Sequence, residues 1–205
     1  LAPNWPREYG GAEWDAVQRQ IFEDECCRAH APRIVPFGLS MLAPVLMAFG
    51  SEEQRQRFLP RIASGDLHVA FGVTEPDAGT DTTNIKCFAR REGDHYIVRG
   101  RKVWTSKALE SERVLLLVRT TPLEEARKTD MGQYHGLTLF IVPTNAPGIE
   151  KHLIPIGFNE GVGQYTLFFD NVEIPQDQVV GEVDMRKYIN SAWDEGYNCS
   201  KYKIG

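Results

Sequence analysis

The chain has 205 residues, of which 42% are hydrophobic and 25% charged, and its formal net charge is −5. This composition is typical of a globular protein with a sizeable core, and it excludes a disordered chain. The negative charge disfavours a nucleic-acid surface, and no apolar run approaches the roughly 20 residues that span a bilayer.

The cysteines and the first residues bear on the cellular compartment. Cys26 and Cys27 are adjacent and the other two cysteines stand alone, so the spacing fits neither a disulfide framework nor a zinc site. We therefore expect reduced thiols in an intracellular protein. Residues 1–6 contain neither an initiator methionine nor the features of a signal peptide, so we expect the natural beginning to lie further upstream.

Two helices are predicted after a loop over residues 1–12. An apolar stripe at helical spacing indicates the first helix, which closes at Ala31-Pro32. The stripe consists of Trp14, Val17, Ile21, Phe22 and Cys26. The second helix covers residues 39–49 and ends at Gly50. It is apolar on nearly all sides, so we expect it to be buried.

A third helix is predicted from a capping signal. Ser51 and Gln54 have the spacing of a capping box, in which each side chain bonds the other residue's backbone N–H. The helix that follows should turn Phe58 inward and end at Ser64-Gly65.

After Asp66 the periodicity changes from helical spacing to the alternation of β-strands. Gly100 should interrupt one strand, Asp170-Asn171 should form a turn, and residues 121–136 should form a long polar loop. The predicted strands cover residues 69–73, 85–91, 96–98, 102–106, 114–118, 137–142, 149–154, 165–169 and 172–175. Strands at this spacing indicate an antiparallel barrel or sandwich.

The predicted fold class is therefore α+β, an N-terminal α-helical segment followed by an antiparallel β-barrel domain. We divide the chain into an incomplete N-terminal helical region over residues 1–66, a middle β-barrel domain over 67–182, and the start of a truncated or divergent C-terminal helical region over 183–205.

The stretch over residues 71–81 has the composition of a ligand loop. A β-like apolar run breaks at Pro76 and Gly79, and the turn leaves backbone N–H groups unpaired. Such concavities suit anionic groups such as a pyrophosphate. An ordinary turn after a strand is the alternative. Its carboxylates, Glu75, Asp77 and Asp81, are interpreted as solvated residues that hold the loop rather than as acids or bases.

A second stretch, Trp104-Thr105-Ser106, could face a planar redox-active ring. Trp104 would supply a flat wall, with hydroxyl and backbone N–H groups beside it. The alternative is that Trp104 belongs to the core of the β domain. The chain has no glycine-rich dinucleotide fingerprint, so a flavin dinucleotide would bind without a Rossmann unit.

Five blocks of the sequence, all in the expected order, resemble motifs of the acyl-CoA dehydrogenases. Residues 71–81 resemble the family's signature, an aromatic residue followed by Glu-Pro-x-Ala-Gly-Ser-Asp, with Thr80 in place of the usual serine. The other blocks are residues 5–11, 49–54, 93–106 and 168–175. The resemblance covers about residues 1–182 and implies a middle β-barrel domain of the acyl-CoA dehydrogenase type.

The resemblance also implies that FAD binds between the β domain and a C-terminal helical bundle. Trp104 would flank the isoalloxazine, Ser106 would lie near the hydride-accepting N5, and Thr80 would also lie near the CoA thioester. The implied flavin contacts are Phe71, Val73, Thr74, Gly79, Thr80, Trp104, Thr105 and Ser106. No metal is implied.

In the family, a glutamate abstracts the α-proton of the acyl-CoA while the β-hydride passes to N5. Electrons then pass to an electron-transfer flavoprotein or a similar acceptor. That glutamate lies in the C-terminal helical domain, so no residue here is assigned as the base, and Glu75 matches a structural position of the signature. The family further implies a homo-oligomer, dimer or tetramer, in the bacterial cytoplasm or the mitochondrial matrix.

Two alternatives remain beside the dehydrogenase. The chain could be a non-catalytic fragment that keeps the β fold without a complete active site. It could also belong to a flavin oxidase or monooxygenase that uses the same fold on another substrate.

Overall fold

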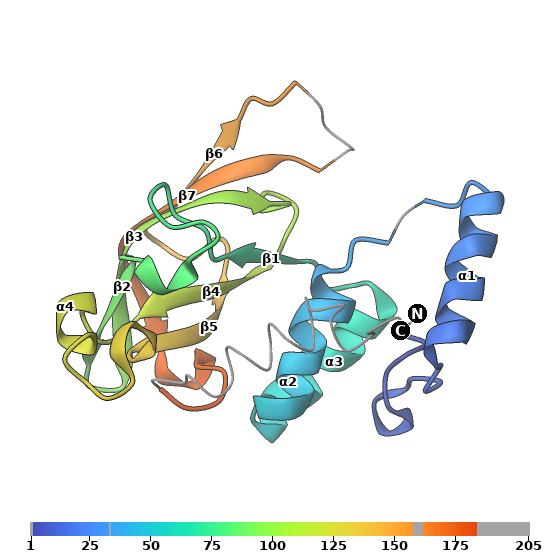
Figure 1. Cartoon of the computed structure of the whole chain (residues 1–205), viewed down its shortest axis with the longest axis horizontal. Helices are drawn as coiled ribbons and strands as arrows, with labels where there is room; N and C mark the ends of the chain where they lie inside the picture. Colours follow the sequence, from blue (N-terminus) through green and yellow to red (C-terminus); the bar gives the residue numbers. More distant parts are fainter. Residues whose placement is uncertain (1, 33, 158–161, 184–205) are drawn as a thin grey trace.

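The computed structural model describes residues 2–32, 34–157 and 162–183, and these form a helical part followed by a β domain (Figure 1). The predicted start of a C-terminal helical region falls almost wholly on residues 184–205, outside the described residues. The helices are α1 (Ala16–Arg28), η2 (Phe37–Leu42), α2 (Ala43–Phe49), α3 (Glu52–Ser64) and α4 (Leu123–Ala126), and the 3₁₀ turns are η1 (Arg7–Tyr9), η3 (Thr82–Asn84), η4 (Gly132–Tyr134) and η5 (Gln176–Gln178). No helix in this part of the chain is both long and apolar enough to cross a membrane.

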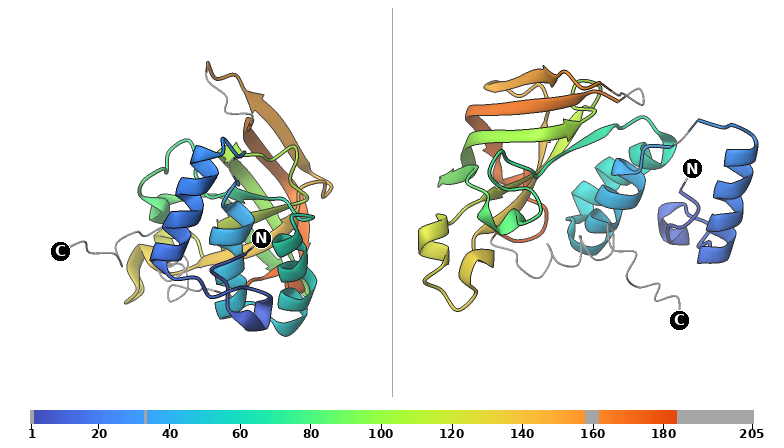
Figure 2. Two further views of the ribbon diagram at one scale, coloured as in Figure 1. Left: turned by 90° about the vertical axis from the view of Figure 1, so that its right-hand side faces the viewer. Right: turned by 45° about the horizontal axis from the view of Figure 1, so that its top comes forward.

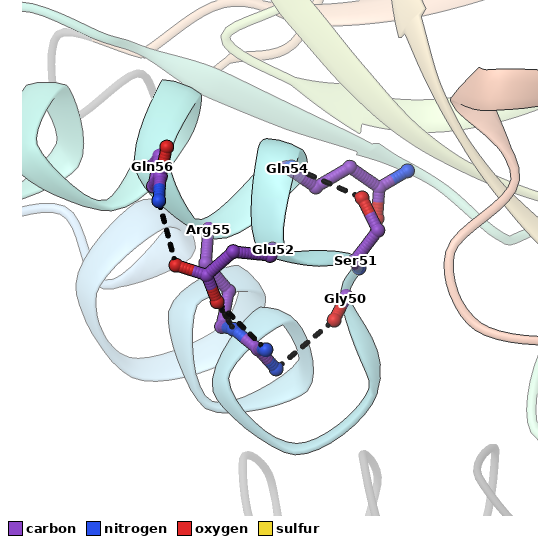
Figure 3. A network of polar contacts seen from close by, with 6 residues as sticks. All are labelled: Gly50, Ser51, Glu52, Gln54, Arg55 and Gln56. Atoms are coloured by element: carbon purple, nitrogen blue, oxygen red, sulfur yellow. Dashed lines mark hydrogen bonds and ion pairs between the residues drawn. The ribbon is translucent and has the colours of Figure 1, made fainter.

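The capping box that begins α3 is confirmed (Figure 3). The Gln54 backbone N–H donates to Ser51 Oγ at 3.2 Å, and the Ser51 N–H donates to Gln54 Oε1 at 3.2 Å. Glu52, in the first turn, also accepts from Arg55 at 2.9 Å and from Gln56 at 2.8 Å. These bonds satisfy donors that a helix start leaves free, so the sequence fixes this boundary locally.

The second predicted helix is present as a π-helical turn, η2, that continues into α2. Four of its residues are fully or almost fully buried, namely Leu42, Ala43, Val45 and Leu46. Gly50 ends the helix as predicted, but with an extended backbone at φ −66° rather than a left-handed one. A Cβ at Gly50 would lie 2.7 Å from the Leu46 carbonyl oxygen, so close approach explains the glycine.

The first predicted helix, α1, is present but packs none of its residues into the described core. It lies beyond α2 and α3 from the sheet (Figures 1 and 2). Val17 and Ile21, in its apolar stripe, are 66% and 57% exposed. Trp14 and Phe22 contact each other edge to face at 5.5 Å between ring centroids. The stripe therefore forms an exposed apolar face, where helical periodicity predicts a packed one.

The β domain is a seven-stranded curled sheet, and the predicted α+β class is confirmed. The strands are β1 (Val69–Gly72), β2 (Phe88–Glu92), β3 (His95–Ser106), β4 (Arg113–Arg119), β5 (Leu137–Pro143), β6 (Ile149–Ile154) and β7 (Gln164–Pro175). Their order is β1-β4-β2-β3-β7-β6, with β5 also paired to β4. The sheet is mixed rather than wholly antiparallel, because β1 and β2 both run parallel to β4.

Strand β4 separates two hydrophobic clusters, which explains its continuous apolar sequence. Leu115 and Leu117 pack into the cluster formed with α2 and α3, whereas Leu116 packs into the cluster inside the curled sheet. Helices α2 and α3 therefore cover one face of the sheet, and this packing holds them against the β domain.

Three predicted interruptions in the β domain differ from the structure. The turn predicted at Asp170-Asn171 is wrong, because β7 runs through it with a bulge at Asn171 (φ 52°). Gly100 lies opposite the same bulge, and β3 continues through it without ending. The loop over residues 121–136 contains α4 and η4. Bulges let a single strand bend where the sequence suggests two.

Candidate functional site

The stretch over residues 71–81 leaves β1 and closes a tight turn. The Glu75 N–H donates to the Ala78 carbonyl at 2.9 Å, and the Ala78 N–H donates to the Glu75 carbonyl at 3.1 Å. Gly79 and Thr80 follow at the surface. A Cβ added at Gly79 would have no described heavy atom within 4 Å outside its own chain neighbours, so the backbone here is open to close approach.

Glu75 is not the solvated turn residue that the sequence predicts. It is 7% exposed, and its carboxylate accepts from the Lys86 N–H at 2.7 Å, the Cys87 N–H at 2.9 Å and the Lys102 ammonium at 2.8 Å. A carboxylate with three donors is a structural acceptor, which argues against Glu75 as a catalytic base.

The other two carboxylates of the stretch hold the loop, as the sequence predicts. Asp77 is exposed and pairs with the Lys86 ammonium at 3.4 Å. Asp81 caps η3 by accepting from the Thr83 N–H at 3.0 Å. Both side chains are exposed, as expected for residues that hold a surface turn.

Trp104 stands at the end of β3 with its side chain 55% exposed, so the alternative that it belongs to the core is wrong. Its backbone is left-handed, with φ 57°, an uncommon conformation for a large residue. It lies in a register shift between Lys102 and Thr105. The bulge turns the indole outward, and the Val103 N–H donates to the Thr74 carbonyl at 2.9 Å, joining this strand end to the loop.

Thr105 and Ser106 have different environments. The Thr105 side chain is completely buried, and its Oγ1 has no hydrogen-bond partner among the described residues. Ser106 is partly buried, and its hydroxyl donates to Gln164 Oε1 on β7 at 2.8 Å. Of these two residues, Ser106 is therefore the one whose hydroxyl is partly accessible.

Phe71 and Val73 complete the set that the sequence identifies. Phe71 is partly buried against Phe37 of η2, with ring centroids 5.8 Å apart. The Val73 carbonyl accepts from the Lys102 ammonium at 3.0 Å. The structure thus brings Thr74 beside the end of β3, with Gly79 and Thr80 on the far side of the turn.

Burial shifts two titratable groups behind the loop. It raises the pKa of the Cys87 thiol to about 12, and it lowers the pKa of the Lys102 ammonium below the value usual for lysine. Lys102 is fully buried, and Glu75 offsets part of that desolvation. Both side chains lie inside the fold and not at its surface.

Two buried cations near the loop are missed by sequence reasoning, because strand alternation gives no sign of them. Lys102 is one. The other is Arg119, 1% exposed, whose guanidinium donates to the Ile85 carbonyl at 2.9 Å, the Gln133 carbonyl at 2.7 Å and the His135 carbonyl at 2.9 Å. Arg119 also donates to the Thr83 carbonyl. It therefore ties η3 to η4 and to the residue that follows η4.

A cavity of about 630 Å³ lies elsewhere, between α3 and the segment that includes η5. It is lined in part by the capping-box residues Ser51 and Gln54, and by none of the candidate site residues described in this subsection. Within the described residues, no group of three or more His, Cys, Asp or Glu side chains is arranged to hold a metal ion.

Comparisons with known proteins agree over most of the chain. Residues 1–66 match the family model "Acyl-CoA dehydrogenase, N-terminal domain", and residues 70–172 match "Acyl-CoA dehydrogenase, middle domain". The chain is 42% identical over 183 residues to acyl-CoA dehydrogenase FadE26 of Mycobacterium tuberculosis, covering 89% of this chain and 44% of that protein. It spans less than half the length of the curated relatives that it matches first.

Solved structures give the same picture. The ChsE4-ChsE5 complex from Mycobacterium tuberculosis matches at 38% identity with a TM-score of 0.82, covering 95% of this chain and 48% of the other. The Tcur3481-Tcur3483 steroid ACAD matches at 32% identity with a TM-score of 0.81, over 95% and 48%. A glutaryl-CoA dehydrogenase from Mycobacterium smegmatis in complex with FADH2 matches at 27% identity with a TM-score of 0.76, over 96% and 48%.

Proposed function

The chain belongs to the acyl-CoA dehydrogenase family, and on that premise we propose that it forms the flavin-facing half of an FAD-dependent enzyme that dehydrogenates an acyl-CoA thioester between Cα and Cβ. One observation carries the proposal. The exposed indole of Trp104 stands at a strand end that is hydrogen-bonded to Thr74 of the loop, at 2.9 Å between Val103 N and the Thr74 carbonyl.

The residues present fit a flavin in type and exposure. Trp104 offers an apolar face for the ring system, and the open backbone at Gly79 with the Thr80 hydroxyl suits a pyrophosphate. Phe71, Val73 and Thr74 would contact the flavin from the loop. Because the Thr105 side chain is buried, its contact would come from the backbone. FAD would supply the acceptor for the substrate's β-hydride.

On the substrate side, the chain's own residues would orient and shield rather than transfer protons. Thr80, exposed after the turn, would also meet the thioester. Ser106 would be held beside the flavin by Gln164. The base that takes the α-proton would come from polypeptide outside the half that this chain spans, because Glu75 is held in its ion pair.

Electrons would leave to an electron-transfer flavoprotein or a similar acceptor. We expect the complete enzyme to be an intracellular oligomer. The ChsE4-ChsE5 complex, which this chain resembles, supports assembly with a second chain. The steroid ACAD makes steroid-derived acyl-CoA esters a substrate class to include in assays.

The alternatives are tested on the same protein. The exposed apolar face of α1 promotes association of the isolated chain under any of the three alternatives, so it does not separate them. After addition of FAD and removal of unbound flavin by gel filtration, the protein should retain absorption at about 450 nm. Anaerobic acyl-CoA should then bleach that band in the protein that carries the base. A protein that holds flavin but is bleached by no acyl-CoA would not be a dehydrogenase, and rapid reoxidation by O₂ would indicate the oxidase or monooxygenase alternative.

Two variants test the flavin-facing residues. Trp104→Ala should weaken FAD binding about tenfold or more, because stacking on a large ring is lost. Trp14→Ala, two residues before α1, is the matched control and should bind normally. Unchanged affinity in Trp104→Ala would refute the stacking role.

Gly79→Val should also lower FAD occupancy, because the added side chain blocks approach to the backbone. Gly157→Val is its control, since a Cβ at Gly157 likewise has no described heavy atom within 4 Å outside its chain neighbours. Full occupancy in Gly79→Val would exclude close contact between this turn and the pyrophosphate.

A further inference from the structure

We propose that Glu75 and Lys102 form a positioning pair that closes the loop over residues 76–85 at its base and fixes it against the strand that carries Trp104. This inference rests on the proposed function only for its consequence on flavin, because the clamp itself is a property of the fold.

The carboxylate of Glu75 joins the two arms of the loop. It lies where the chain leaves β1, yet it accepts from the N–H groups of Lys86 and Cys87, 11 and 12 positions later, at 2.7 and 2.9 Å. One oxygen serves Lys86, and the other serves both Cys87 and Lys102. A single side chain therefore holds the incoming and outgoing arms together.

The ammonium of Lys102 connects this junction to β3. It donates to Glu75 Oε1 at 2.8 Å and to the Val73 carbonyl at 3.0 Å, and its side chain is 0% exposed. The next residue on the strand, Val103, donates to the Thr74 carbonyl. Residues 73–75 are thus bonded to consecutive residues of β3, two and one positions before Trp104.

The pair is suited to positioning because it is buried. Charge-assisted bonds in a low dielectric are strong and directional, whereas an unpaired partner would leave a buried charge. An exposed pair would tolerate many geometries. Here the loop cannot move away from β3 without exposing or separating both charges, so the distance between the Gly79-Thr80 turn and Trp104 is fixed.

The experiment compares Glu75→Gln and Lys102→Met with Lys128→Met, a control that makes the same substitution at an exposed lysine outside the loop. Three readouts are used: hydrogen exchange of the Lys86 and Cys87 amides, the ¹⁹F resonance of 5-fluorotryptophan at position 104, assigned by its loss in Trp104→Phe, and the dissociation constant of FAD.

We expect both pair variants to speed exchange at Lys86 and Cys87 by tenfold or more, to shift the Trp104 resonance and to weaken FAD binding by roughly tenfold, which corresponds to about 1.4 kcal/mol. Lys128→Met should change none of these. An unshifted Trp104 resonance with an FAD dissociation constant within about twofold of wild type would overturn the proposal.

The wild-type protein keeps the test decisive if a variant fails to fold. Its Lys86 and Cys87 amides should exchange as slowly as those of β4, and exchange as fast as at Thr80 would show that the clamp does not exist. Wild-type protein that shows slow exchange but binds no FAD would refute the proposed function and leave the clamp intact.

Discussion

Substitution of Gly100 by alanine is expected to destabilise the fold strongly. Gly100 has φ 144°, which L-residues rarely adopt, and it sits at the register shift where β3 bends between β2 and β7. A Cβ built on Gly100 would lie 2.6 Å from Cys87 Sγ and 2.8 Å from both Cys87 Cα and Cβ. The close contacts include backbone, so a change of side-chain rotamer cannot relieve them.

The magnitude follows from two costs. Backbone strain of this kind costs about 1–3 kcal/mol. Overpacking a filled site costs about 1–3 kcal/mol more. The free energy of unfolding should therefore fall by about 2–6 kcal/mol, a large part of the roughly 5–15 kcal/mol of a typical domain. With a urea m-value of about 2 kcal/mol/M, the unfolding midpoint should fall by about 1–3 M.

Urea unfolding followed by far-UV circular dichroism measures this shift. Gly79→Ala is the matched control, because Gly79 has no left-handed backbone and no described heavy atom near its Cβ position outside its chain neighbours, so its midpoint should stay within about 0.5 M of wild type. Adding Cys87→Ala to Gly100→Ala should recover only the part due to Sγ, since Cα stays in place. A Gly100→Ala midpoint equal to that of Gly79→Ala would refute the reasoning.

Three further predictions concern groups around the same core. The Cys87 thiol, with a pKa of about 12, should resist alkylation at pH 8 while Cys26 and Cys27 react. The native thiol keeps its proton at high pH, while the unfolded thiol loses its proton from about pH 9. The free energy of unfolding should therefore fall between about pH 9 and 12, by up to about 1.4 kcal/mol per pH unit relative to Cys87→Ala. If urea unfolding gives the two proteins the same dependence on pH, this prediction is contradicted. Ser51→Ala removes the cap of α3 and should cost about 0.5–2 kcal/mol in urea unfolding, whereas Ser64→Ala, at the other end, should cost less. Arg119→Met should leave the carbonyls of residues 83, 85, 133 and 135 without their donor and lower the free energy of unfolding by about 3 kcal/mol or more. A thermal midpoint within about 2 °C of wild type would show that these four hydrogen bonds contribute little.

Local sequence signals predicted the elements of this fold well. The capping box at Ser51 and Gln54 gave the start of α3, because both partners lie within one helical turn. The apolar run of β4 indicated a strand covered on both faces, and both clusters are present. At Asn171 the sequence predicts a turn where the structure has a bulge in β7, because asparagine is common both in turns and at bulges with a left-handed backbone.

The sequence predicts the motif of the candidate site, but not the buried residues that hold the motif in place. The loop over residues 71–81 and the strand end at Trp104 are identifiable by sequence, since their spacing and residue types lie in short continuous blocks. The roles of Glu75 and Lys102 are not. Glu75 in a turn resembles any solvated carboxylate, and only its partners, 11 to 27 positions away, make it a buried acceptor.

Most of the helices and strands, and the family resemblance, can be predicted from the sequence, because periodicity, caps and motifs depend on residues close together in the chain. The short helices in residues 121–136 and the continuity of β3 and β7 cannot. The tertiary structure alone decided that β1 pairs in parallel with β4, that the apolar stripe of α1 is exposed and that Trp104 faces outward. The structure also shows that the loop over residues 71–81 is closed by a buried ion pair, where the sequence predicts a turn with solvated carboxylates. Burial and ion pairing depend on which distant segments meet, and local patterns carry no record of that.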